Sequence, residues 1–223
     1  MKKFIILLCA MSLACVSCSD EKSGTSSTEG NALVSDTIGE GINVDENEMP
    51  FGATMTDLES DRDGVPISIS YENRFMTEDE ARKISDYISA VNSCDAELMK
   101  NTCYPSYLDY LVTEYENTDV QDYLDSRHSD IESSYTGGEF DFDYILINSL
   151  MDENDDDSDT GFSILDSKIL EQSPDAEITS RKMVGIDVLY NLEGDDGSYS
   201  FTTRTGSDMK LYIYTIDGQI YIL

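Results

Sequence analysis

The chain has 223 residues, and its 46 Asp and Glu residues outnumber 14 Lys and Arg residues, which gives a formal net charge of −32 at pH 7. Between Lys100 and Lys168 the only Lys or Arg is Arg127, so no basic stripe interrupts this charge. Nucleic acids and anionic membrane surfaces both attract proteins of the opposite sign. The composition therefore excludes nucleic-acid binding and peripheral binding to anionic lipids. Its negative field favours cations or cationic peptides as partners, or simply keeps the chain soluble and unaggregated, which is the preferred interpretation.

The first residues have the pattern of an export signal. Two lysines precede an apolar run over residues 4–16, which is too short to span a ~30 Å hydrocarbon layer and indicates a signal peptide that is removed. Cys18 follows the small residue Ser17 and precedes another serine, which is typical of the lipid-accepting cysteine of bacterial lipoproteins. Cys15 is the alternative acceptor. We therefore expect residues 1–17 to be a lipoprotein signal peptide, and a lipid on Cys18 to anchor the chain to the extracytoplasmic face of the cell membrane.

The chain after the signal divides into three parts by composition. Residues 18–48 are rich in Ser, Gly, Thr and acidic residues. They cannot bury enough apolar surface to fold, and they predict a disordered acidic tether that spans ~30 Å r.m.s.. Residues 49–73 predict an extended lead-in with one strand over residues 67–71, where apolar and polar residues alternate. Residues 74–223 predict a single domain, long enough to bury a hydrophobic core.

Helical patterns come first in the domain. Thr77 and Glu80 have the spacing of a capping box, and Ala81, Ile84 and Ile88 follow at the spacing of a buried helix face. Further helices are expected at residues 95–104, after Pro105, from Thr118 to Gly137, and at residues 165–172.

Strand patterns dominate the second half. Phe140, Phe142 and Tyr144 alternate with acidic residues in a strand expected to end near Met151, which is the period of a strand with one buried face. Further strands are expected at residues 184–192, 199–205, 209–216 and 219–223, with a tight hairpin at Asp217-Gly218. Helices followed by such a meander predict an α+β fold, in which N-terminal helices pack on one face of a curved antiparallel sheet.

Two resemblances bear on this chain. The motif VSCS around Cys18, the acidic tether and the segment over residues 49–111 resemble a group of exported lipoproteins of Gram-positive, Clostridia-type bacteria, to which no function is attached. The element order of residues 74–223 is similar to the cystatin-like roll of the nuclear transport factor 2-like superfamily. That resemblance implies helices packed on a strongly bent sheet that forms a cone with an open mouth. The superfamily hosts isomerases, dehydratases and non-enzymatic modules, so the fold does not decide the function.

The case for catalysis depends on one histidine. Enzymes of this superfamily place an Asp, His or Tyr inside the cone for proton transfer, and His128 is the only histidine of the chain. His128 is either an inward-pointing base or a helix-surface histidine paired with Glu132 or Asp125. No GxSxG motif and no matched nucleophile and acid accompany it. The sequence therefore favours a non-enzymatic binding or accessory module, with an enzyme that uses the cone interior as the alternative.

Two acidic stretches suggest calcium, because Ca²⁺ prefers carboxylate oxygens. They are Asp152–Gly161 and Glu59–Gly64, and as EF-hand loops both lack the closing glutamate, with Ser167 and Ser70 at those positions. Weak Ca²⁺ association therefore remains open, and with it a calcium-responsive cell-envelope protein as a second alternative. No cofactor and no strong metal site are expected.

Cys94 and Cys103 are the cysteines left after Cys18. A disulfide between them would close a loop of ten residues, worth ~2.7 kcal/mol, and two buried thiols are the other outcome. Because the chain after Cys18 has neither a CxxC pair nor a histidine cluster, zinc binding and thioredoxin-type chemistry have no support there.

Three tyrosines lie close together in the helical part of the chain. Tyr104, Tyr107 and Tyr110 either line a groove for glycans or peptides, or are core aromatics whose hydroxyls reach water.

The expected partner of the whole chain is an extracellular ligand, cationic or derived from the cell wall. We expect a monomer to bind it.

The choice of lipid acceptor can be tested in cells. Cys18→Ala is expected to abolish metabolic labelling of the chain with a lipid, while Cys15→Ala retains it, because only the acceptor cysteine supplies the thioether sulfur. Labelling that persists in Cys18→Ala and is lost in Cys15→Ala would move the acceptor to Cys15.

Overall fold

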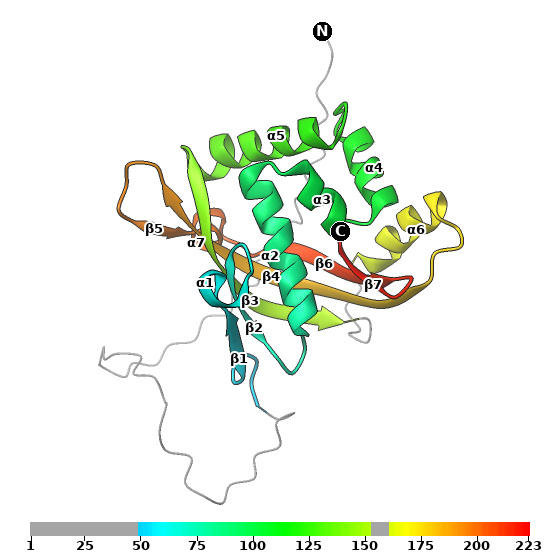
Figure 1. The fold of residues 1–223 in the computed structure, drawn as a ribbon, viewed down its shortest axis with the longest axis horizontal. Coiled ribbons are helices and arrows are strands. Elements are labelled where there is room, and N and C mark those ends of the chain that lie inside the picture. The colour runs from blue at the N-terminus through cyan, green and yellow to red at the C-terminus, as the bar shows by residue number, and fades with distance from the viewer. Residues whose placement is uncertain (1–48, 153–160) are drawn as a thin grey trace, which may run out of the picture. The chain divides into compact units, whose positions relative to one another are not determined.

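The computed structural model describes residues 49–152 and 161–223, which belong to one compact unit (Figure 1). The predicted signal peptide and tether, both candidate lipid acceptors, and residues 153–160 of the second acidic stretch lie outside the described residues. Within the described residues, no helix is both long and apolar enough to cross a membrane. The fold is a mixed α+β arrangement, which confirms the predicted class at that level.

The described residues form one seven-stranded sheet in the order β1-β2-β3-β4-β6-β7, with β5 paired to β4 beside β6. The strands are β1 Met55–Leu58, β2 Ser68–Glu72, β3 Phe140–Asp152, β4 Ile178–Leu192, β5 Ser198–Ser200, β6 Met209–Ile216 and β7 Gln219–Ile222. All pairs are antiparallel except β2 with β3, which is parallel. The prediction of a purely antiparallel sheet is therefore wrong at one pair. Parallel pairing requires a long crossover, and the helices between β2 and β3 supply it.

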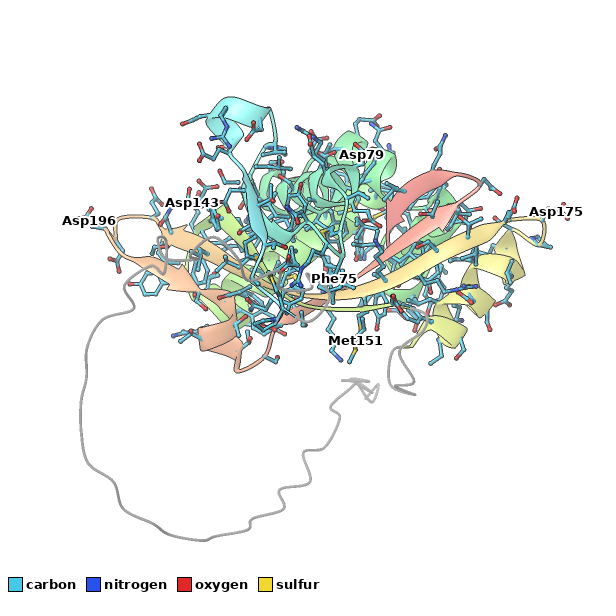
Figure 2. All side chains as sticks on the ribbon, turned by 90° about the horizontal axis from the view of Figure 1, so that it is seen from below. Phe75, Asp79, Asp143, Met151, Asp175 and Asp196 are labelled. Atoms are coloured by element: carbon cyan, nitrogen blue, oxygen red, sulfur yellow. The ribbon has the colours of Figure 1, made fainter. Side chains whose placement is uncertain are left out.

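Helices α2–α5 form that crossover, and in Figure 2 they gather on one side of the long strands. The helices are α1 Ser60–Asp63, α2 Glu78–Ser93, α3 Ala96–Thr102, α4 Pro105–Glu114, α5 Val120–Ile131, α6 Phe162–Gln172 and α7 Phe201–Thr205, with a π-helical turn at Glu132–Thr136. Apolar side chains from α2, such as Ile84 and Ile88, pack against sheet residues such as Ile145, Val184 and Ile186 in the main core. A second, smaller core lies under α6.

The start of α2 confirms the predicted capping box. The Glu80 amide donates to Thr77 Oγ1 at 3.3 Å, and the Thr77 amide donates to Glu80 Oε2 at 2.8 Å. Ala81, Ile84 and Ile88 are buried, as their spacing predicts. The helix ends at Ser93, and its C-cap residue Cys94 has a positive φ of 52°.

Two predicted boundaries are wrong because of side-chain hydrogen bonds to the backbone. Helix α5 is capped by Asp119 rather than Thr118, since Asp119 Oδ1 accepts from the Asp122 amide at 3.0 Å. The strand expected over residues 67–71 is displaced by one residue, because the Ile67 amide donates to Ser85 Oγ at 3.0 Å instead of to a neighbouring strand.

Of the strand expected over residues 199–205, only Tyr199 and Ser200 are strand, as part of β5, and helix α7 follows. Asp187 Oδ1 accepts from the Thr202 amide at 2.8 Å, and Ser200 Oγ accepts from the Thr203 amide at 3.0 Å. These two acceptors satisfy the free amides of a helix start. They therefore favour a helical turn where the sequence alternates like a strand.

A buried ion pair fixes the beginning of the folded unit. The side chain of Glu72 is 1% exposed, and the Arg74 guanidinium donates to both of its oxygens at 3.0 Å. Glu72 also accepts from the Gly52 amide at 2.7 Å, and Arg74 donates to the carbonyls of Met49 and Pro50 at 3.1 and 2.9 Å. The pair thus joins the end of β2 to the segment that leads into the fold. Hydrogen bonds from Arg74 first, and then from Thr54 and Gly52, lower the pKa of Glu72 to about 2 although burial opposes them.

Glu72→Gln is expected to lower the free energy of unfolding at pH 7 by about 3 kcal/mol, because it leaves a buried guanidinium without its anion. The folded-state pKa of Glu72 lies below its ordinary value of 4.5. Its contribution is therefore complete above that value and is lost as the pH falls toward 2. Urea unfolding should show a difference from the unmodified chain that shrinks over this range. The control Glu139→Gln, at an exposed residue, should change little at any pH, and an unchanged stability of Glu72→Gln at pH 7 would contradict the assignment.

Candidate functional site

A polar groove lies where helix α2 meets the last hairpin of the sheet. Its cavity volume is about 440 Å³, within the range of small-molecule sites. It is lined by Asp79, Arg82, Lys83, Asp86, Asn101, Gly218, Gln219, Ile220 and Tyr221. We refer to it as the α2–β7 groove. The chain joins its two walls across more than 130 residues (Figure 1), so only the folded sheet brings them together.

Each wall has a local reason for its shape. On α2, Asp79, Arg82, Lys83 and Asp86 are separated by three, one and three positions, which places them in one stripe on the helix surface. On the opposite wall, Asp217 and Gly218 have φ values of 52° and 78°, as a tight hairpin turn requires. The Asp217 carboxylate accepts from the Glu177 amide at 2.9 Å and so ties the turn to the residue just before β4.

The two basic side chains of the groove are held by protein partners. Arg82 donates to Glu78 Oε1 at 2.9 and 2.7 Å and to the Asp63 carbonyl at 2.8 Å. Lys83 Nζ donates to the Asn101 carbonyl at 2.9 Å. Because an ammonium has three N–H donors, Lys83 keeps donors for a ligand. The Arg82 charge is largely balanced by Glu78.

Asp86 is the unusual group of the groove. It is partly buried, and within residues 49–152 and 161–223 its carboxylate has neither a hydrogen bond nor an ion pair. Burial raises the pKa of Asp86, and the charges of Lys83 and Arg82 oppose that rise only in part. Asp79, at the N-terminal end of the same stripe, is exposed and is likewise without a hydrogen bond in the described part of the chain. A partly buried carboxylate without a partner is an acceptor that a ligand can satisfy.

The β7 wall adds an aromatic ring and further amide groups. The Tyr221 hydroxyl donates to Gln219 Oε1 at 2.8 Å, which leaves the Gln219 amide nitrogen as a donor. The Tyr221 ring meets Tyr104 edge-to-face, with ring centroids 5.2 Å apart. The groove therefore offers carboxylate acceptors, ammonium and amide donors and one ring, which is a set suited to binding a polar ligand.

His128 lies outside this groove. Its ring stacks on Phe140 at a centroid distance of 4.5 Å, on the α5 side of the main core. In the described residues it forms no ion pair with either Asp125 or Glu132. The structure thus gives His128 a packing contact on Phe140.

The three tyrosines singled out in the sequence do not line one groove. Tyr107 and Tyr110 form a tilted pair with centroids 5.9 Å apart, and Lys168 Nζ lies 4.6 Å from the Tyr110 ring centroid. Tyr104 is instead a core residue that supports Tyr221. The ring that reaches a cavity is Tyr221, which sequence reasoning placed only in a strand.

The described residues contain no group of three or more His, Cys, Asp or Glu side chains that could hold a metal ion. In the stretch Glu59–Gly64, the Asp63 carboxylate accepts from Arg62 Nη2 at 2.9 Å and from the Glu59 amide at 2.8 Å. Most of the second acidic stretch, Asp152–Gly161, lies outside the described residues, so Ca²⁺ association there stays a prediction.

The sequence contains the α2 stripe but no signal of what packs opposite it. Asp86, Gln219 and Tyr221 were therefore missed as site residues. The helical spacing of Asp79, Arg82, Lys83 and Asp86 was available as a signal, since a mixed-charge stripe beside a buried face can line a groove at the edge of a sheet.

Comparisons with known proteins do not assign this site. No family model matches the chain, and neither a curated protein nor a solved structure matches it significantly.

The cysteine pair gives a direct test of the helical layer. Cys94 and Cys103 are free thiols in the structure. Cys103 is buried, with Sγ 3.2 Å from Met99 Sδ, and burial raises its pKa to about 12. Cys94 is partly exposed. The chain from residue 19 is therefore expected to show one reactive thiol with Ellman's reagent when folded and two in denaturant.

In that assay, Cys94→Ser should remove the signal of the folded chain, which identifies the reactive thiol. If no thiol reacts in denaturant until a reductant is added, the two cysteines form the disulfide instead.

Proposed function

We propose that this chain is a lipid-anchored, extracytoplasmic binding module whose ligand occupies the α2–β7 groove. One observation carries the proposal: Asp86 lies partly buried in that groove without a partner in the described residues. Desolvating a carboxylate without a hydrogen bond is unfavourable. A ligand that supplies the missing donor would recover that free energy.

The size and composition of the groove support this proposal. A volume of about 440 Å³ accommodates a small ligand, and polar groups converge on it from α2, α3 and β7. The interface between α2 and the sheet is filled by apolar side chains. His128 packs on Phe140 outside the groove. These features favour binding over proton-transfer chemistry.

The proposed location rests on the sequence pattern of residues 1–48. A signal peptide, a lipid on Cys18 and an acidic tether would hold the folded unit outside the membrane, at ~30 Å r.m.s. from the anchor. We also propose the cystatin-like roll as the finer description of the α+β fold, on the basis of the element order. Neither proposal affects the geometry of the groove.

The groove can be tested with a matched pair of tryptophan substitutions. In a thermal-shift screen of the chain from residue 19 against cations, glycans and cationic peptides, ligands of the groove should raise Tm. Gln219→Trp fills the groove from the exposed side chain of β7 and is expected to abolish these shifts. Gln172→Trp, at an exposed residue near the end of α6, should retain them.

Shifts that survive in Gln219→Trp would place the ligand elsewhere, and a screen with no shift would remove the support for a binding module of this ligand range.

A further inference from the structure

We infer that the ligand of the α2–β7 groove carries a primary ammonium together with a hydrogen-bond acceptor, as the amino end of a peptide does, and that Asp86 binds the ammonium while Lys83 binds the acceptor. This inference rests on the proposed function and names the chemistry of its ligand. It follows from which polar groups of the groove already have protein partners and which do not.

The carboxylates of the groove determine that the ligand carries a positive charge. Asp79 and Asp86 have no hydrogen bond in the described residues, whereas Arg82 is engaged by Glu78 and by the Asp63 carbonyl. With Arg82 balanced by Glu78, the two carboxylates exceed the single remaining charge of Lys83. The groove is therefore locally acidic, in a chain whose net charge is −32. Such a field raises the local concentration of cations and repels anions.

The spacing of the carboxylates argues for an ammonium rather than a divalent ion. Asp79 and Asp86 are seven residues apart on one helix, a rise of roughly 10.5 Å. Two carboxylates at that separation do not ligate one Ca²⁺, which takes six to eight oxygens at about 2.3–2.6 Å. An ammonium needs fewer acceptors, and a single carboxylate gives it a charge-assisted hydrogen bond.

Lys83 supplies the second half of the recognition. Its Nζ donates to the Asn101 carbonyl at 2.9 Å, which holds the ammonium group of Lys83 at the α3 side of the groove. The remaining N–H donors have no acceptor in the described residues, and Lys83 is three residues from Asp86 on the same stripe. A ligand with an ammonium and a carbonyl a few bonds apart can therefore contact both residues at once. The amino end of a peptide has this arrangement, whereas a simple amine has only the ammonium.

Three probes separate these contributions when titrated into the ¹⁵N-labelled chain from residue 19 at low ionic strength. Diglycine carries the ammonium and an adjacent carbonyl, N-acetyldiglycine lacks the ammonium, and n-propylamine carries the ammonium alone. Amide shifts in α2 and β7 report occupancy of the groove. Diglycine is expected to bind about tenfold more tightly than N-acetyldiglycine, the size of a lost charge-assisted hydrogen bond.

Variants assign the contacts. Asp86→Asn should weaken diglycine binding about tenfold without lowering Tm, since Asn has nearly the same shape and carries no charge to desolvate. Asp143→Asn is the matched control, because Asp143 is exposed on β3, away from Asp79 in Figure 2, and loses the same charge. Lys83→Met should weaken diglycine binding but not propylamine binding, because it removes the donor for the acceptor and also a positive charge that repels an ammonium.

Each outcome bears on the inference. Equal binding of diglycine and N-acetyldiglycine, or of the unmodified chain and Asp86→Asn, overturns the assignment of the ammonium. If propylamine binds as tightly as diglycine, the assignment of Lys83 to an acceptor group of the ligand is overturned. The ligand would then need only an amine.

Failure of all three probes overturns the inference but leaves the proposed function standing, provided that other compounds of the screen still raise Tm in a manner that Gln219→Trp abolishes. If Gln219→Trp abolishes the Tm shift of no compound, the inference and the proposed function both fail.

Discussion

The arrangement of this fold depends on one strand. β4 pairs with β3 along residues 182–192 of one edge, and with β6 and then β5 along the other. Its central residues, including Val184, Ile186 and Val188, have no exposed surface. Because both edges of β4 are occupied, it fixes two halves of the chain relative to each other. β3 connects to β2 and the helices, and β6 leads to the last hairpin.

The α2–β7 groove is a consequence of that constraint. Helix α2 packs on the sheet through Ile84 and Ile88, which orients its polar stripe toward the edge strand β7. β7 is placed by its pairing with β6, and the Cys103 segment after α3 bridges to Ile222 on its other side. The site is therefore built on a helix and a strand rather than on free loops. Such a platform holds polar groups in defined positions for a ligand.

Local signals were enough to predict the elements whose determinants are local. The Thr77–Glu80 capping box and the Asp217-Gly218 turn each depend on residues a few positions apart, and both occur as predicted. Helix α7, the parallel β2–β3 pair and the groove were missed for the opposite reason. Ser200 caps α7 locally, but the second acceptor at its start comes from Asp187 on β4. The groove needs α2 and β7 side by side. These determinants are tertiary contacts that no sequence window contains.

Two partly or fully buried carboxylates of this chain have pKa shifts of opposite direction. Glu72 has donors on both oxygens and a lowered pKa, so its ionised form stabilises the folded state above the pKa of the unfolded chain. Asp86 has a raised pKa, so ionising it opposes folding as the pH rises. Glu72 stabilises the fold because donors reach both of its oxygens, whereas burial of Asp86 is offset only in part by the charges of Lys83 and Arg82. A cationic ligand in the groove would therefore gain affinity from a penalty that the unliganded fold already carries.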